Sequence, residues 1–366
     1  MTGPEQSTAP LRVGVVGVGW AGRQHLAAYH ELPGVEIAAI AGQEPDLLAE
    51  LGERYGAERL LERWEDLLEV PDLDAVSIAV PTFLHAPVAI AALKRGLHVL
   101  TEKPLARNAV EGAEMVGAAR DAGRVLDVVF NHRLRGDIQE LGKVIGRGDL
   151  GRPYYARASW MRRRGIPKLG SWFTNQEMAG GGPLADIGVH VLDYSLFLLG
   201  EPKVTSVTAV TYAELGPRDL GGDPRVTADR SSSAFEVEDF ASAFMRLSTG
   251  GTLVLETSWA AFRDPVDLID FRVMGTEGGA ELKAVGATKA KVAELVVYTD
   301  EDGEIADYAP PAGPGTDHAG VVGNFVRVLR APELWSANDG TLALERAKVI
   351  DACYQSAAEK KEIAVG

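Results

Sequence analysis

The sequence is poor in the side chains that build disulfides and metal sites. It contains a single cysteine, Cys353, among 366 residues. One cysteine cannot form an internal disulfide, and zinc or iron–sulfur sites made of several cysteines are excluded as well. The seven histidines show neither HxH nor HxxxH spacing. We therefore expect no metal ion in the function of this chain.

Basic residues and long apolar runs are also scarce. Lysine and arginine number 37 against 52 acids, a net charge of −15. This balance argues against nucleic acids and anionic membranes as partners. Every apolar run is shorter than the roughly 18 residues that a membrane span needs, and the first twelve residues do not read as a signal peptide. We expect a cytoplasmic protein.

The first third of the chain alternates short apolar runs with helical segments. Runs such as Leu11–Gly17, Val35–Ala41 and Asp74–Val80 are apolar throughout, which is typical of parallel strands buried on both faces. Strands that alternate with helices form βαβ units. Residues 1–130 are therefore predicted to form an α/β, doubly wound Rossmann domain for binding a dinucleotide.

After residue 131, strand-like runs follow one another through short turns. Alternation in Val204–Tyr212, Thr252–Ala260 and Val266–Met274 predicts an α+β domain over residues 131–340 with a large, mainly antiparallel sheet. Residues 216–233 are polar and are interpreted as a mobile surface loop. Residues 341–366 are expected to form a helix that packs back on the first domain.

A GxGxxG pattern directly follows the first predicted strand and opens a helix, which is the context that gives this pattern its meaning. The first glycine permits a tight turn, the second lets the backbone approach a pyrophosphate, and the third allows close helix packing. N–H groups at the helix start then favour phosphate. The predicted cofactor-binding run is Gly17, Val18, Gly19, Trp20, Ala21 and Gly22.

The end of the second strand bears on the choice of cofactor. Dinucleotide sites usually carry an acid there, which bonds the adenosine ribose of NAD. The corresponding residue is Gly42, which leaves space for the 2′-phosphate of NADP, whereas the nearby Glu44 would repel that phosphate. Gly42 and Gln43 are expected at the ribose, and NAD and NADP both stay open.

Two later loops follow strands at the same edge of the predicted sheet, where such sheets bind ligands. Pro81, Thr82 and His85 are expected to contact the cofactor, unless they only begin a helix. Glu102 and Lys103 are expected at the cofactor as well. A lysine there can lower the pKa of a substrate hydroxyl or donate a hydrogen bond to it, although a solvent-exposed lysine is the plain alternative.

Asp186 and His190 lie four residues apart on a helix predicted after Gly182 and Pro183. Residues at this spacing share one helix face. The pair suits proton transfer, with His190 as the base and Asp186 orienting it or binding a hydroxyl. The alternative is an acid that stabilises the helix dipole beside a packed histidine.

Other aromatic and basic residues near these motifs are candidates for substrate contacts. Aromatic rings stack on the apolar faces of sugars, and arginines bind anionic groups, but core packing and surface ion pairs account for such residues as well. The candidates are Arg133, Trp160, Arg163, Trp172 and His318.

In this order, the motifs resemble those of the Gfo/Idh/MocA family, which is named after glucose–fructose oxidoreductase, inositol dehydrogenase and a rhizopine-catabolism protein. The resembling runs are GVGWAGRQH, AVPTFLHAPVAIAALKRGLHVLTEKPLA, GGGPLADIGVHVLD and VEDFASAFMRLSTGGTLVLETSW. The resemblance spans nearly the whole chain.

The resemblance implies an NAD(P)-dependent oxidoreductase. It would transfer a hydride between the nicotinamide and a carbinol or keto carbon of a sugar, cyclitol or related polyol. Lys103, His190 and Asp186 would be catalytic, and the second-domain sheet would form a homodimer or homotetramer. A redox-neutral glycosidase or lyase on the same fold and a non-catalytic dinucleotide sensor are the alternatives.

Overall fold

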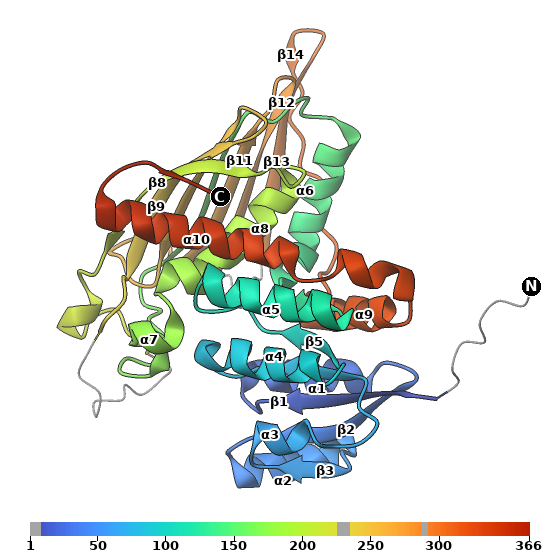
Figure 1. Cartoon of the computed structure of the whole chain (residues 1–366). Helices are drawn as coiled ribbons and strands as arrows, with labels where there is room; N and C mark the ends of the chain where they lie inside the picture. Colours follow the sequence, from blue (N-terminus) through green and yellow to red (C-terminus); the bar gives the residue numbers. More distant parts are fainter. Residues whose placement is uncertain (1–8, 225–234, 287–291) are drawn as a thin grey trace, which may run out of the picture. The chain divides into compact units, whose positions relative to one another are not determined.

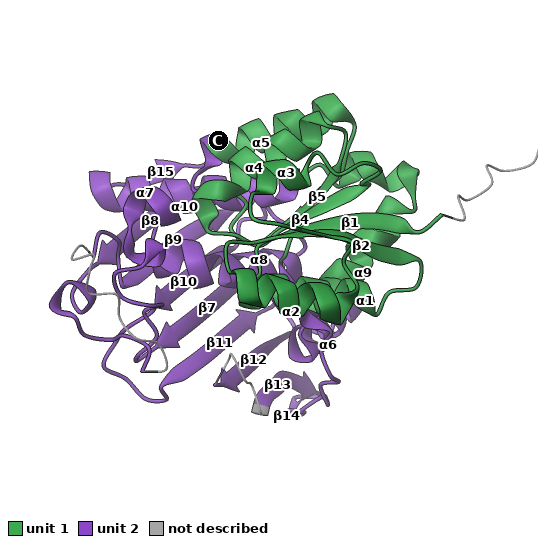
Figure 2. Cartoon of the chain, turned by 90° about the horizontal axis from the view of Figure 1, so that it is seen from below, with its two compact units in different colours: residues 1–105, 111–129, 318–341 green, residues 106–110, 130–317, 342–366 purple. Residues whose placement is uncertain are grey.

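The computed structural model describes residues 9–224, 235–286 and 292–366 (Figure 1). The chain forms two compact units, each assembled from separate stretches of sequence (Figure 2). Unit 1 comprises the chain up to residue 105 together with residues 111–129 and 318–341. Unit 2 comprises residues 106–110, 130–317 and 342–366.

Unit 1 is built on a six-stranded parallel sheet with the order β3-β2-β1-β4-β5-β6, which is the strand order of a Rossmann domain. Its strands are β1 (Leu11–Val16), β2 (Val35–Ala41), β3 (Arg59–Leu61), β4 (Ala75–Ile78), β5 (His98–Thr101) and β6 (Leu126–Val128). The associated helices are α1 (Trp20–His30), α2 (Pro45–Tyr55), α3 (Trp64–Leu67), α4 (His85–Lys94), α5 (Ala109–Ala122) and α9 (Asp317–Leu329).

The predicted doubly wound sheet is confirmed, and its continuous apolar runs explain it. Val13, Val15 and Ile40 are fully buried, and burying each such side chain stabilises the fold by about 1.5–3 kcal/mol. The sequence did not reveal β3, because its three residues are mostly exposed and carry no apolar run.

Residues 318–341 belong to unit 1, whereas the predicted second domain extended over residues 131–340. Arg330 donates hydrogen bonds to the carbonyl oxygens of Pro33 (2.8 Å) and Gly34 (3.0 Å). The Trp335 ring packs edge-on against His98, with ring centroids 4.3 Å apart. These contacts join residues more than two hundred positions apart, which local sequence patterns do not encode.

Unit 2 contains a nine-stranded mixed sheet with the order β14-β13-β12-β11-β7-β10-β9-β8-β15. The paired strands are antiparallel except for β7 with β10, so the predicted mainly antiparallel sheet is confirmed. Its strands are β7 (Tyr155–Arg162), β8 (Val204–Tyr212), β9 (Phe240–Leu247), β10 (Thr252–Ser258), β11 (Asp267–Met274), β12 (Gly278–Val285), β13 (Val292–Glu301), β14 (Glu304–Ile305) and β15 (Ile363–Ala364).

Helices of unit 2 cover one face of this sheet, as Figure 1 shows for α8 and α10. Their apolar side chains and the inward residues of the strands form one core, which includes the fully buried Tyr194, Trp259 and Phe271. The helices are α6 (Gly136–Arg147), α7 (Gln176–Ala179), α8 (Val189–Leu198) and α10 (Thr341–Glu359).

The C-terminal helix was predicted to pack back on the first domain. The structure places it in unit 2, and its packing on the first domain stays a prediction. Residues of α10 such as Val349 and Cys353 lie in the core of unit 2, and Arg346 pairs with Asp193 at 3.1 Å. The chain then ends in β15, which pairs with β8. An apolar helix face shows that a helix is buried, but not which surface it meets.

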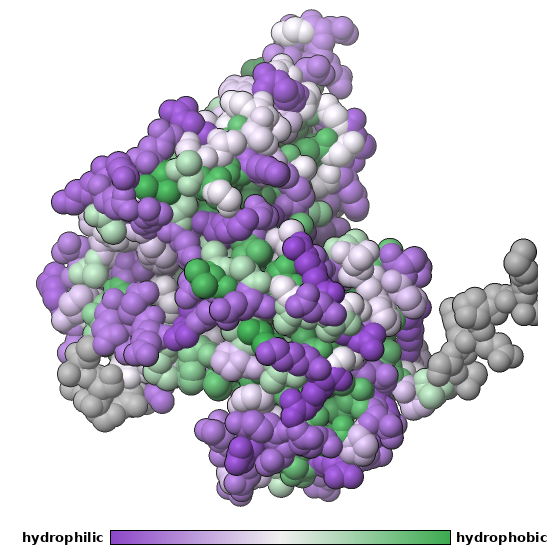
Figure 3. All heavy atoms as spheres, in the orientation of Figure 1, coloured by the Kyte–Doolittle hydropathy of each residue, from purple (hydrophilic) through white to green (hydrophobic). Residues whose placement is uncertain are grey.

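The predicted loop over residues 216–233 is described only up to residue 224. This part contains a short 3-10 turn, Gly216–Arg218, and the remainder lies outside the described residues. Figure 3 shows hydrophilic side chains interspersed with smaller hydrophobic groups on the face turned to the viewer. Within the described ranges, no helix is long and apolar enough to cross a membrane. The cytoplasmic location stays a prediction.

Candidate active site

Two glycines of the GxGxxG loop are required by close backbone approaches. Gly17 has a φ of 102°, and a Cβ added there would lie 2.1 Å from the carbonyl oxygen of Ala79. A Cβ on Gly22 would lie 1.9 Å from the carbonyl oxygen of Gly17. Only glycine therefore fits at these positions, which bring α1 close to the sheet.

The start of α1 fits a dinucleotide phosphate. A Cβ built on Gly19 would meet no atom of residues 9–224, 235–286 or 292–366 within 4 Å, so these residues leave the side of the loop at Gly19 open. No side chain of the described residues caps this helix, and its first turn carries no acid. Its first N–H groups are thus suited to an anion. Trp20, the first residue of α1, is 63% exposed.

Gly42 has a packing role that the sequence did not show. A Cβ there would lie 2.7 Å from Cγ2 of Val18, so a side chain at residue 42 would collide with the glycine loop. Packing thus accounts for the missing acid, and space for a 2′-phosphate is not needed to explain it. Gln43 and Glu44 follow with exposed side chains. The choice between NAD and NADP stays open.

The Glu102–Lys103–Pro104 turn follows β5 and is held by buried histidines. Oε1 of Glu102 lies 3.2 Å from Nε2 of His25 and 3.3 Å from Nε2 of His318. Burial alone would raise the pKa of Glu102, but the hydrogen bonds and charges of both histidines outweigh it and hold this pKa well below its usual range. His318, predicted as a substrate contact, is buried and bonded to Glu102.

These three side chains also form a group with metal-ligating atoms, all within 4.8 Å of one another. The distances from the Glu102 carboxylate to the two imidazole rings are within hydrogen-bond range, so hydrogen bonds explain why these side chains lie together. The expectation that no metal is involved stays a prediction.

His85 fastens the same turn from another loop. Its Nδ1 lies 2.8 Å from the carbonyl oxygen of Pro104, and its Nε2 lies 2.9 Å from that of Val80. Burial lowers the pKa of His85, and these two hydrogen bonds oppose that effect only in part. Thr82 is buried nearby in the turn Thr82–Leu84. Contacts of Pro81, Thr82 and His85 with a cofactor stay predictions.

In unit 2, Asp186 and His190 lie where a π-helical turn, Leu184–Gly188, leads into α8. The sequence predicted an ordinary α-helix here. Trp259 donates a hydrogen bond from Nε1 to Oδ2 of Asp186 at 2.9 Å. The buried His190 ring stacks on His132 with centroids 4.4 Å apart.

His132 and Trp259 were not predicted from the sequence as neighbours of Asp186 and His190. His132 follows the last Rossmann strand, and its position at the end of a parallel strand was the signal that could have drawn attention to it. Trp259 follows β10, and the pattern of that segment did not point to Asp186.

The turn that leads to Asp186 is fixed by Glu238. This carboxyl accepts hydrogen bonds from the backbone N–H groups of Gly182 (3.0 Å) and Leu184 (2.9 Å) and from the Tyr354 hydroxyl (3.0 Å). Burial raises the pKa of Glu238. A Cβ on Gly181 would lie 1.9 Å from the Tyr354 hydroxyl oxygen, which explains the glycine at this position.

The candidate substrate residues of unit 2 contact other protein groups. Arg133 binds both carboxylate oxygens of Asp193 at 2.6 Å. The Trp160 indole is buried and donates to Asp267 at 2.8 Å. Their role as substrate contacts stays a prediction, as it does for Trp172, which stacks on Phe173, and for the exposed Arg163.

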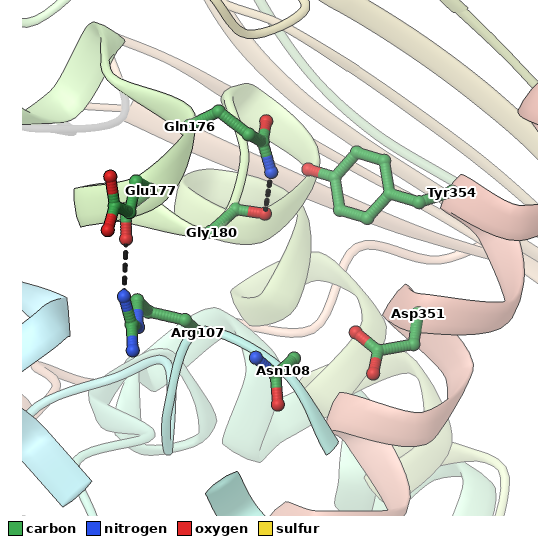
Figure 4. Close-up of a pocket in the computed structure, with 7 residues that line it drawn as sticks. All are labelled: Arg107, Asn108, Gln176, Glu177, Gly180, Asp351 and Tyr354. Atoms are coloured by element: carbon green, nitrogen blue, oxygen red, sulfur yellow. Dashed lines mark hydrogen bonds between the residues drawn. The ribbon is translucent and has the colours of Figure 1, made fainter. Parts of the chain in front are cut away.

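Unit 2 also holds a polar pocket of about 410 Å³. Figure 4 shows Asp351 and Tyr354 of α10 facing the segment that precedes α5. Arg107 donates a hydrogen bond to the carbonyl oxygen of Glu177 at 2.7 Å, and Asp351 accepts one from the N–H of Ala109 at 2.7 Å. The pocket is lined by Arg107, Asn108, Gln176, Glu177, Gly180, Asp351 and Tyr354.

Comparisons with known proteins agree with these features. Residues 11–130 match the model of an oxidoreductase family with an NAD-binding Rossmann fold. Residues 138–281 match the GFO/IDH/MocA C-terminal domain.

Similar proteins carry related names. The chain is 32% identical to D-glucoside 3-dehydrogenase of Escherichia coli, with 82% of each chain covered. It is 30% identical to levoglucosan dehydrogenase of Pseudarthrobacter phenanthrenivorans, over 83% of this chain and 81% of the relative. A solved structure of levoglucosan dehydrogenase with NADH and levoglucosan is 26% identical, with a TM-score of 0.81 and coverage of 97% and 99%.

Proposed function

This chain belongs to the GFO/IDH/MocA oxidoreductase family, and on that premise we propose that it interconverts a hydroxyl and a carbonyl group on a sugar or cyclitol with NAD or NADP. The observation that carries the proposal is the start of α1, where Gly19 leaves the uncapped helix open to a dinucleotide. Relatives that act on glucosides and levoglucosan support the substrate class.

In this proposal, the chain's own residues bind the cofactor, orient the substrate and move its proton. The cofactor, when bound, supplies the hydride acceptor or donor. The N–H groups at the start of α1 would hold its phosphates. Lys103 donates a hydrogen bond to the substrate oxygen and stabilises negative charge that develops there. His190 takes the hydroxyl proton. Asp186 orients His190 or binds a substrate hydroxyl, and its Oδ2 is held by a hydrogen bond from Trp259.

The first experiment follows nicotinamide absorbance with a panel of glucosides, anhydro-sugars, free sugars and inositols, using NAD and NADP in parallel. We expect one cofactor to be reduced with one group of substrates. The reverse reaction is followed with keto-sugars and the reduced cofactors. No net change in either direction would contradict a dehydrogenase and favour redox-neutral chemistry or a sensor.

The role of Lys103 is tested with Lys103→Met, which keeps the length of the side chain and removes its charge. Turnover should fall by about 10³-fold or more, because the developing oxyanion loses its donor, while cofactor affinity stays within about threefold. Lys94→Met, at the exposed end of α4, is the matched control and should keep full turnover. Near-normal turnover of Lys103→Met would remove this lysine from the mechanism.

We further propose that the chain forms a homodimer or homotetramer through the face of the unit 2 sheet opposite the helices α8 and α10. Exposed side chains on this face include Val210 and Tyr212 of β8, Phe244 of β9 and Val285 of β12. Exposed apolar side chains gathered on one sheet face often mark an interface. Cross-strand ion pairs, such as Arg157 with Glu256, lie on the same face and would limit non-specific pairing.

A further inference from the structure

The carboxylate of Glu102 joins three segments of unit 1. Its Oε1 lies within 3.3 Å of His25 on α1 and of His318 on α9, and its Oε2 accepts a hydrogen bond from the backbone N–H of Lys103 at 3.2 Å. The helix that starts the dinucleotide site, the turn that carries Lys103 and a helix from near the C-terminus therefore meet at one side chain.

The cluster of His25, Glu102 and His318 is buried, so the carboxylate of Glu102 needs both histidines as hydrogen-bond partners. His25 is fully buried, and His318 and Glu102 are below a tenth exposed. A buried carboxylate is costly unless it is paired and hydrogen-bonded. Removing one histidine would leave the Glu102 charge incompletely paired, so the side chain and the turn attached to it would rearrange.

Both histidines are themselves held in place. Nδ1 of His25 lies 2.8 Å from Oγ of Ser77 on β4, so the ring is fixed at both nitrogens. The His318 ring meets Trp20 edge-on, with centroids 5.1 Å apart and an interplanar angle of 88°. Trp20 is the exposed first residue of α1, within the glycine loop. The cluster thus extends from the sheet to the dinucleotide loop.

The Lys103 turn is fastened on its other side by His85, whose Nδ1 lies 2.8 Å from the Pro104 carbonyl oxygen. Lys103 therefore lies between Glu102 and Pro104, and both of these residues are hydrogen-bonded to buried histidines. Its own side chain is only half-buried, as a group that must reach a ligand needs to be.

We propose that Glu102 and His318 are positioning residues that hold the Lys103 turn in a fixed place relative to the start of α1. Neither needs to touch the substrate. Glu102 acts through the backbone of Lys103, and His318 acts through Glu102 and Trp20. The sequence predicted a cofactor contact for Glu102 and a substrate contact for His318, whereas this geometry assigns both to the support of Lys103. The inference rests on the proposed catalytic role of Lys103.

The test compares His318→Gln, His318→Leu and Glu102→Gln in the full chain. The glutamine at 318 can still donate an N–H to Glu102, whereas leucine cannot. Hydrogen–deuterium exchange is measured on the peptide that contains Lys103. We expect exchange there to become about tenfold faster in His318→Leu and Glu102→Gln, and to stay near wild type in His318→Gln. His30→Gln, on the exposed side of α1, is the control and should change nothing.

Kinetics give the second readout. A displaced lysine should lower kcat by about 10- to 100-fold while the KM for substrate and the cofactor Kd stay within about threefold, with recovery in His318→Gln. Unchanged exchange in His318→Leu, or equal losses with glutamine and leucine, would overturn the proposal. Because exchange is independent of turnover, a protein without dehydrogenase activity would contradict the proposed function and still leave the positioning result readable.

Discussion

Gly19 and Gly22 lie three residues apart in the same loop, yet a methyl group added to each would meet different surroundings. At Gly19 the space is open and the backbone φ of −62° suits any residue. At Gly22 the methyl carbon would lie 1.9 Å from a carbonyl oxygen. The two glycines therefore serve different purposes, one for the ligand and the other for the fold.

Alanine substitutions separate these purposes. Gly22→Ala should lower the free energy of unfolding by about 2 kcal/mol or more, because backbone must move to admit the methyl group. Gly19→Ala should change it by less than about 0.5 kcal/mol and weaken NAD(H) binding about tenfold or more, since the methyl group stands where a phosphate would approach. Urea unfolding and calorimetric titration measure the two quantities. Equal effects of both substitutions would contradict this division.

His98 is a buried histidine whose neutral form the fold requires. Its Nδ1 accepts a hydrogen bond from the Val125 N–H at 3.0 Å, which a protonated ring could not do. Burial, followed by the charge of Arg124, lowers the pKa of His98 from 6.5 to about 4. Below pH 6.5, His98 is therefore protonated in the unfolded chain while it stays neutral in the folded chain.

This linkage predicts the direction of a pH effect. Stability should begin to fall below about pH 6.5 and stop falling through this group below about pH 4, with a loss on the order of 3 kcal/mol. His98→Asn keeps an acceptor in place of Nδ1 but does not titrate. Urea unfolding between pH 7 and pH 4 should show a smaller loss in this variant, and identical pH profiles would rule out His98 as a source.

At the scale of elements, the turn Leu184–Gly188 depends on α10, although some 150 residues separate them. Glu238 accepts two backbone N–H groups at the start of this turn and the hydroxyl of Tyr354 from α10. The carboxyl thus serves as a helix cap that comes from outside the helix. The placement of Asp186 and His190 follows from this cap.

Substitutions of Tyr354 and Glu238 should lower the free energy of unfolding by different amounts. Tyr354→Phe removes one hydrogen bond and should cost about 1 kcal/mol of stability. Glu238→Leu leaves two backbone donors and the hydroxyl without their acceptor and should cost about 3 kcal/mol, with loss of turnover. In a double-mutant cycle the two losses should be less than additive. Strict additivity would mean that the hydroxyl and the carboxyl act independently.

At the scale of the whole molecule, the proposed oligomer depends on the apolar side chains of the exposed sheet face. Phe244→Glu places a charge beside the exposed apolar side chains of β8 and should shift the mass measured by light scattering toward the monomer. Val110→Glu, at another exposed apolar residue, should leave the mass unchanged. A wild-type chain that is monomeric at micromolar concentration would contradict the interface.

The local sequence determined the parallel sheet, the antiparallel sheet and the glycine loop. Apolar runs such as Val35–Ala41 fix buried strands. The close approach of Gly22 to Gly17 lies within one strand–turn–helix unit, whereas Gly17 meets the carbonyl oxygen of Ala79 after β4. Lys103, Asp186 and His190 were identified by their motifs, and their catalytic roles stay predictions.

Tertiary structure alone decided where the distant segments pack. It placed α9 in unit 1 and α10 in unit 2, moved His318 to the side of Glu102, and brought His132 onto His190 and Trp259 onto Asp186. Each of these pairs joins residues far apart in the chain. A hydrophobic or hydrogen-bonding pattern reports that a side chain needs a partner, but the identity of that partner depends on how the whole chain packs.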